Sequence, residues 1–210
     1  YGAQDIYLTG NPQITFFKVV YRRHTNFSME SIKQTLNGQT TPSSNGSATC
    51  TVSRNGDLVH KVYVEITGEG SGGTYIKYDE LVKQAELEIG GQMIDKQTSE
   101  WNQIWADLTT PESKADGFKC MTGACNIPNV NVVGEVHVPL NFWFCRNAGL
   151  ALPLIALQYH EVKVKVNFET AARIFETAAN LDVTSLSSTK LWADYIYLDT
   201  DERRRFAQVS

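Results

Sequence analysis

The sequence predicts an all-β fold, an antiparallel jelly-roll sandwich of about eight strands with one short helix and long loops. Apolar and polar residues alternate over several short segments, as they do along strands with one buried face. Turns rich in Gly and Asn separate these segments. Helical segments do not alternate with strands, as they would in a parallel α/β fold. A chain of 210 residues is a normal length for one such sandwich.

The strands are expected at residues 27–36, 48–53, 58–67, 85–89, 92–95, 134–144, 154–168 and 190–199. The clearest alternation places Val162, Val164, Val166 and Phe168 on one face of a strand. Residues 85–89 (AELEI) also alternate strictly and then reach Gly90-Gly91, which predicts a hairpin with the glutamates facing water.

Two connections between strands carry further signals. Residues 27–36 alternate out of phase, which predicts a bulge or a change of face near Ser31. Residues 48–53 and 58–67 flank Arg54-Asn55-Gly56-Asp57, and Asn-Gly between two apolar runs predicts a hairpin.

One segment has the spacing of a helix. Residues 99–108 (SEWNQIWADL) place Trp101, Ile104, Trp105 and Leu108 at helical intervals, with Ser99 as the expected N-cap and Pro111 beyond the end. Residues 109–132 lose this pattern and are expected to form a long loop.

Composition and charge exclude several classes of function. The net charge of −4 and the pI of about 5.6 do not suit a protein that coats nucleic acid. No nucleophile elbow or metalloprotease motif is present, and the four histidines are scattered. Residues 68–73 match GxGxxG, but a β-rich stretch follows them instead of a helix, which favours a flexible loop. We expect no catalytic site, cofactor or metal.

Four cysteines follow no signal peptide, so reduced thiols are expected. Cys120 and Cys125 lie close together in the predicted long loop. A zinc site would need a second pair of ligands, which the neighbouring sequence does not supply. Free thiols are therefore the expectation. The chain starts with Tyr1 instead of Met, so it is expected to be part of a longer protein.

Two short basic clusters remain, Arg22-Arg23-His24 and Arg203-Arg204-Arg205. The first follows Asn11-Pro12, a good N-cap and first-turn pair, and residues 13–23, which could form a helix that is apolar nearly all round. Such a helix is stable only when protein covers it. Arginine favours bidentate ion pairs across interfaces, so contacts between subunits are preferred to nucleic acid or a membrane surface.

Residues 2–32 (GAQDIYLTGNPQITFFKVVYRRHTNFSMESI) resemble the start of the major capsid protein of large icosahedral DNA viruses, the phycodnaviruses and their giant-virus relatives. Further motifs resemble that family in the same order: SRNGDLV (53–59), ELEIGGQMIDK (86–96), GLALPLIALQYHEVK (149–163) and WADYIYLDTDERRRFAQ (192–208). Only residues 109–132 and 168–188 lack a counterpart, and loops in this family vary freely.

The resemblance implies a double jelly roll, with residues 1–26 as an N-terminal docking segment, 27–210 as the first jelly roll, and a second one after residue 210. It implies homotrimers with a pseudo-hexagonal outline that tile an icosahedral capsid shell of the virion, assembled in the host cytoplasm. Minor capsid proteins would lock these capsomers around an inner membrane, without membrane insertion or direct nucleic-acid contact. Residues 37–47, 68–74 and 109–132 are expected to face outward.

The residues expected at the subunit interface come from both ends of the chain: Ile14, Phe16, Phe17, Val20, Tyr21, Arg22, Arg23, Arg203, Arg204 and Arg205. Three alternatives stay open at this point. A single jelly-roll minor capsid protein would have the same pattern. A carbohydrate-binding module could use Tyr75, Tyr78 or Trp101, and a cupin-like enzyme would need clustered histidines.

Overall fold

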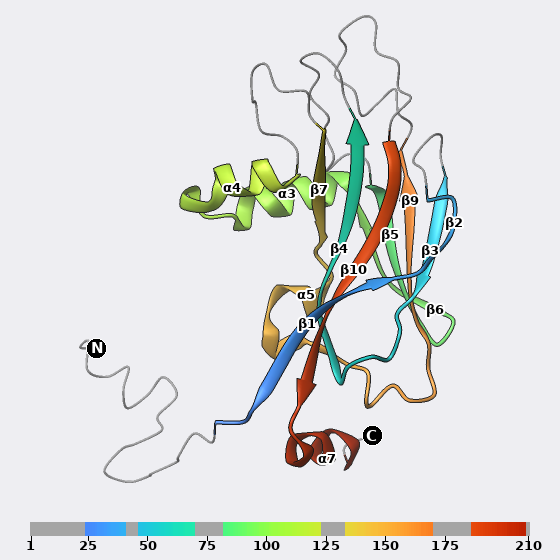
Figure 1. Cartoon of the computed structure of the whole chain (residues 1–210), viewed down its shortest axis with the longest axis vertical. Helices are drawn as coiled ribbons and strands as arrows, with labels where there is room; N and C mark the ends of the chain where they lie inside the picture. The colour runs from blue at the N-terminus through green and yellow to red at the C-terminus, as the bar shows by residue number, and fades with distance from the viewer. Residues whose placement is uncertain (1–23, 41–45, 70–81, 123–132, 170–185, 209–210) are drawn as a thin grey trace, which may run out of the picture.

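The computed structural model describes residues 24–40, 46–69, 82–122, 133–169 and 186–208. Two antiparallel sheets face each other as a sandwich (Figure 1). The first sheet has the order β1-β10-β4-β7, with β8 paired to β4: β1 (Phe27–Gln34), β10 (Leu186–Leu198), β4 (Leu58–Glu69), β7 (Val133–Leu140) and β8 (Leu152–Pro153). The second has the order β2-β3-β9-β5-β6: β2 (Leu36–Gly38), β3 (Ser47–Thr51), β9 (Val162–Phe168), β5 (Val82–Ile89) and β6 (Gln92–Thr98).

Apart from the short β2 and β8, the described residues form eight strands of the sandwich. Each sheet pairs strands from the first half of the chain with strands from the second half, as two Greek keys do in a jelly roll. The predicted fold class is therefore confirmed.

The core lies between the two inner faces. The predicted inward residues of β9 are all buried: Val162, Val164, Val166 and Phe168. In the β5–β6 hairpin, Ala85 and Leu87 are fully buried, and Gly90 and Gly91 take φ angles of 61° and 84° in the turn. Positive φ explains the two glycines, because side chains with a Cβ avoid this region. The hairpin prediction is confirmed.

The change of face in residues 27–36 occurs at a different place from the predicted one. The chain runs through Ser31 in β1 without interruption and crosses to the other sheet at Thr35, between β1 and β2. Since β1 is an edge strand and exposed along most of its length, its sequence carries no consistent buried face. The prediction of a bulge near Ser31 was wrong.

The Asn55-Gly56 pair does not form a hairpin either. β3 belongs to the second sheet and β4 to the first, so residues 52–57 cross between the sheets. Gly56 is required by a close approach: a Cβ there would lie 2.8 Å from the Cβ of Tyr195. Packing, and not a type I′ turn, explains this glycine.

The predicted strand at 154–168 begins only at Val162. Ahead of it the chain forms turns, because the guanidinium of Arg54 donates hydrogen bonds to the carbonyls of Leu157, Gln158 and His160. Those carbonyls therefore need no neighbouring strand. The predicted strand at 134–144 likewise ends at Leu140, and α5 (Trp143–Arg146) and η1 (Ala148–Leu150) follow.

The expected helix is α3 (Ser99–Thr109), and its N-cap is Thr98 instead of Ser99, with the Thr98 hydroxyl accepting from the Trp101 amide at 3.4 Å. The predicted loop 109–132 contains a second helix, α4 (Glu112–Thr122), and α7 (Thr200–Gln208) follows β10. The prediction of a single helix was wrong. The sequence of α4, ESKADGFKCMT, has no apolar stripe that could mark it.

The strand registers place the long connections at one end of the sandwich. Ser47 pairs with Asn167 and Val82 with Phe168 in one sheet, while Glu69 pairs with Val133 in the other. At the opposite end Phe27 pairs with Leu198, so the chain enters β1 beside the point where it leaves β10 for α7 (Figure 1). The strand ends that flank the long connections therefore lie at one end of the sandwich, and the start of β1 and the end of β10 lie at the other.

Candidate assembly surface

The outer face of the first sheet carries a buried carboxylate. Glu65 on β4 has a side chain only 5% exposed, and it accepts hydrogen bonds from the Lys190 ammonium and, at 2.6 Å, from the Trp192 indole. The Nε2 atom of His137 lies 3.9 Å from the same carboxylate. Tyr63 stacks on Trp192 with ring centroids 6.5 Å apart. These side chains form a connected cluster on the outer face of the first sheet.

The charges of this cluster shift the pKa values of its members. Burial alone would raise the pKa of Glu65, but hydrogen bonds from Lys190 and Trp192 and the nearby positive charges outweigh it and lower that pKa. The hydrogen bond to Glu65 raises the pKa of Lys190. Both groups are therefore held in their charged forms.

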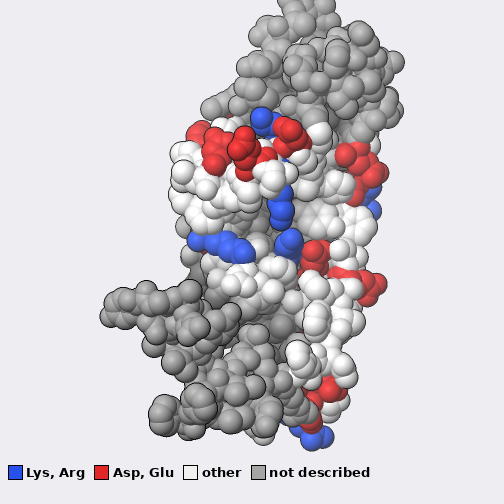
Figure 2. Space-filling view, turned by 90° about the vertical axis from the view of Figure 1, so that its left-hand side faces the viewer, with Lys and Arg blue, Asp and Glu red and all other residues white. Residues whose placement is uncertain are grey.

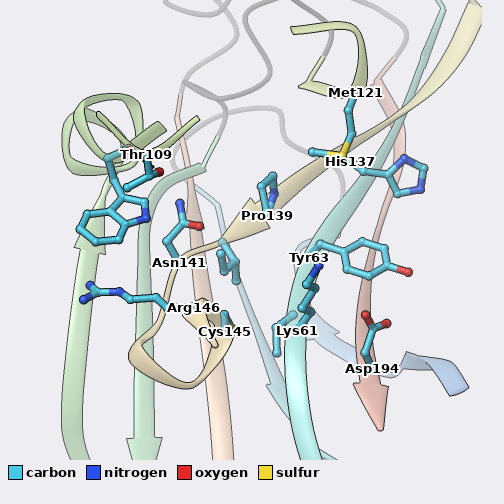
Figure 3. A pocket seen from close by; sticks show the side chains of 13 residues that line it. Lys61, Tyr63, Thr109, Met121, His137, Pro139, Asn141, Cys145, Arg146 and Asp194 are labelled. Carbon is cyan, nitrogen blue, oxygen red and sulfur yellow. Dashed lines mark hydrogen bonds between the residues drawn. The ribbon is translucent and has the colours of Figure 1, made fainter. Parts of the chain in front are cut away.

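A groove of about 780 Å³ lies beside this cluster, between the sheet and the helices (Figure 3). The sheet contributes Lys61, Tyr63, His137 and Pro139, and the helices contribute Trp105, Thr109, Met121 and Arg146. The Arg146 guanidinium lies 4.2 Å from the centre of the Trp105 ring, a cation–π contact. Aromatic, arginine and methionine side chains are the types enriched where proteins bind one another.

The described residues that line the groove form no catalytic constellation. Cys145 is the thiol among them, and burial raises its pKa to about 12, so the reactive thiolate is not formed at neutral pH. Within the described residues, no three His, Cys, Asp or Glu side chains cluster as metal ligands. No helix of the described segments is long and apolar enough to span a bilayer.

Of the residues predicted at an interface, those from Ile14 to Arg23 lie outside the described residues, as do Tyr75 and Tyr78. The three arginines lie on α7, which buries none of its residues. Arg203 pairs with the buried carboxylate of Asp57 at 2.9 Å, and Arg205 pairs with Glu202 of its own helix at 3.1 Å. Arg203 thus holds α7 to the domain, while Arg204 remains exposed.

One prediction about the cysteines was wrong. Cys120 on α4 is disulfide-bonded, and its partner lies outside the described residues, whereas Cys50 and Cys145 are free. The expectation of free thiols came from the missing signal peptide and the missing second pair of metal ligands, and neither observation excludes a disulfide. Cys50 is a core residue, and burial raises its pKa to about 11.

Comparison with known proteins shows the family. A family model described as "Major capsid protein N-terminus" matches residues 15–199. The chain belongs to this family of capsid proteins. It is 54% identical to the major capsid protein of Pyramimonas orientalis virus, covering 100% of this chain and 54% of that protein. It is 45% identical to the major capsid protein of Paramecium bursaria Chlorella virus 1, covering 100% and 48%.

Solved structures agree with the sequence comparisons. A quasi-atomic model of the PBCV-1 virus capsid matches with a TM-score of 0.76 at 40% identity, covering 92% of this chain and 48% of that one. The Faustovirus major capsid protein matches in fold alone, at 13% identity and a TM-score of 0.67. The chain therefore spans about half the length of the relatives it matches. Capsid proteins of this family are structural and non-enzymatic.

Sequence reasoning missed the groove and the Glu65 cluster. Glu65 is 125 positions from Lys190 and 127 positions from Trp192 along the chain, and a local sequence pattern cannot mark residues so far apart as neighbours. One signal was available: Glu65 lies between Val64 and Ile66 in an apolar run. A carboxylate in that position needs a cationic partner if it becomes buried.

Proposed function

We propose that this chain is the N-terminal jelly roll of a major capsid protein that builds an icosahedral shell by self-association. The observation that carries the proposal is the family membership over residues 15–199, together with a jelly-roll topology in the described strands. The virion shell is the place of action of such a protein. Assembly in the cytoplasm, minor capsid proteins as partners and a nearby inner membrane belong to the same proposal.

The finer part of the proposal is a homotrimer with pseudo-hexagonal outline, in which each subunit has a second jelly roll after this one. Relatives about twice as long support a second domain. Residues 1–26 then act as a docking segment and 27–210 as the first jelly roll. The strands run through the thickness of the shell. The end of the sandwich that carries the long loops faces outward, and the end where β1 begins and α7 follows β10 faces inward.

The two ends of the sandwich support this orientation. Long connections join strands at one end, where variable loops can face solvent without disturbing the core. The other end brings the start of β1 next to the start of α7. The predicted interface residues of both chain ends, Ile14 to Arg23 and Arg204 to Arg205, would be gathered there.

The experiment is to express the complete reading frame that contains this chain and to measure its mass by size-exclusion chromatography with light scattering. A trimer whose negative-stain images have a hexagonal outline is the expected result. A stable monomer at micromolar concentration would contradict the proposal.

A further inference from the structure

Helix α3 packs against the sandwich with the opposite face to the one its sequence suggests. Its buried residues are Ser99 and Asn102. Asn102 is 6% exposed, and within the part of the chain that the structure describes neither atom of its side-chain amide has a hydrogen-bond partner. Burying an unpaired amide opposes folding. The domain on its own therefore places the polar side of this helix inward at a cost.

The apolar side of α3 faces outward instead. Trp101 is 40% exposed, Ile104 53% and Leu108 78%. These three residues are spaced by three and four positions, so they form one stripe along the helix, which we call the α3 stripe. Conflicts between local pattern and burial are expected at functional sites, where a further contact resolves them.

The α3 stripe continues into the groove. Trp105 and Thr109, on the adjacent side of the helix, line the groove wall, and the rings of Trp101 and Trp105 lie 5.7 Å apart. Met121 of α4, 40% exposed, also lines the groove. Stripe and groove thus form one surface with aromatic anchors and Arg146, the side-chain types that dominate the binding energy of protein interfaces.

The position of this surface matters for a shell. Helix α3 follows β6, and α4 precedes β7. In the described chain, β6 and β7 are edge strands, one in each sheet. The helix pair therefore stands on a side of the sandwich and not at either end (Figure 1). When the strands run through the thickness of a shell, the two ends of each sandwich face outward and inward. Neighbouring subunits then contact one another through the sides of their sandwiches.

The charges on this face indicate what kind of partner fits. Figure 2 shows acidic side chains over the two helices and basic side chains beneath them. The exposed acidic residues of the helices include Asp107, Glu112 and Asp116, whereas Lys61 and Arg146 line the groove below (Figure 3). Nucleic acid or an anionic membrane would need a uniformly basic face. A face with both signs suits another protein surface of mixed charge.

We propose that the α3 stripe and the groove are the contact surface for a neighbouring copy of this capsid chain, which covers Ile104 and Leu108 on assembly. The proposal rests on the proposed function, because a second copy is the partner that self-association in a shell supplies. This side contact is separate from the subunit contacts that the sequence predicts at the two ends of the chain.

The test uses the complete capsid protein with Ile104→Glu or Leu108→Glu, and Ile94→Glu as the matched control. Ile94, on β6, is also an exposed isoleucine, 52% against 53%, but it belongs neither to the α3 stripe nor to the groove lining. Self-association is measured by light scattering over a concentration series. We expect the two α3 variants to weaken it on the order of tenfold or more and the control to leave it unchanged.

A second measurement does not depend on a destabilising charge. p-Benzoylphenylalanine replaces Leu108 in the complete protein, and 14N- and 15N-labelled chains are mixed, assembled and irradiated. Mixed-isotope crosslinks between two copies are expected. Two results would contradict the proposed side contact and leave the proposed function intact. In the first, Ile104→Glu assembles as well as the wild type. In the second, position 108 crosslinks only within its own chain or to another protein. A wild type that stays monomeric would overturn both.

Discussion

Glu65 shows how a single residue on the solvent side of a sheet can become part of the structure. Lys190 and Trp192 of β10 and His137 of β7 lie around its carboxylate, on the two strands that flank β4. A buried carboxylate without such partners would be neutralised or would destabilise the fold. The carboxylate of Glu65 therefore needs these partners for the fold to be stable, whereas an exposed carboxylate is solvated by water and does not.

Glu65→Gln is expected to lower the free energy of unfolding at pH 7 by about 1–3 kcal/mol, because charge-assisted hydrogen bonds are replaced by weaker ones. The pKa of Glu65 is lowered on folding, so its contribution is present above its unfolded pKa of about 4.3 and is lost as pH falls through the lower folded value. Urea unfolding at pH 7 and below pH 4 should show the difference between wild type and variant shrinking in acid.

Glu161→Gln is the control for this measurement. Glu161 pairs with Lys163 at 3.2 Å, but its side chain is 70% exposed. Its replacement should change the free energy of unfolding by less than about 1 kcal/mol at either pH. Equal effects of the two substitutions would show that burial of Glu65 contributes nothing.

At the scale of elements, α7 has little buried contact with the sandwich. It buries no residue, and its Arg203 pairs with the buried carboxylate of Asp57. The Asp57 carboxylate accepts from the Leu198 amide at 2.8 Å and from the Arg203 guanidinium at 3.2 Å. The backbone of Asp57 also bonds Ile196 and Ile155. This residue therefore fixes the direction in which the chain leaves the jelly roll.

Arg203→Ala should release α7 without unfolding the sandwich. Because Arg203 is half-exposed, we expect the pair to contribute only about 1 kcal/mol, which corresponds to roughly fivefold faster exchange of the α7 amides. Hydrogen–deuterium exchange followed by mass spectrometry measures this directly. Arg205→Ala, which removes a pair inside the helix, should change the exchange rates less. Unchanged exchange in Arg203→Ala would mean that another contact holds the helix.

At the scale of the whole molecule, one core cluster joins the two sheets of the sandwich in the described residues. The described core cluster draws on β3, β4, β5, β7, β9 and β10, and thus on both sheets. Contacts with other subunits can then depend on segments outside this core. Sequence changes in the connecting segments are then expected to disturb the sandwich less than changes in its core.

Deletion of residues 1–23 from the complete protein tests this separation of core and contact segments. We expect the cooperative unfolding transition to persist, because the described core cluster already draws on both sheets of the sandwich, and self-association to weaken by at least about tenfold, as for the loss of an interface anchor. Thermal unfolding followed by circular dichroism and light scattering measure the two effects. Loss of the cooperative transition would place the segment in the core of the jelly roll instead of at an interface.

The sequence by itself determined the class of fold, the β5–β6 hairpin, the buried face of β9 and the existence of α3. Each of these depends on residues that are neighbours along the chain, since a period of two or of 3.6 residues and a Gly-Gly turn are local signals. The family motifs were also readable, and they led to the same capsid family as the comparisons. Helix α4 was missed for the same reason, because it has no local apolar pattern.

Only the tertiary structure decided which strands share a sheet, which face of α3 is buried and what Arg203 contacts. Residues 54–57 have the sequence of a hairpin, yet β3 and β4 belong to different sheets because their partners, β9 and β10, come from far along the chain. Trp101, Ile104 and Leu108 have the pattern of a buried face, but α3 can bury only the side that the β5–β6 edge meets. Pairing between distant segments sets these features, and a local pattern contains no information about it.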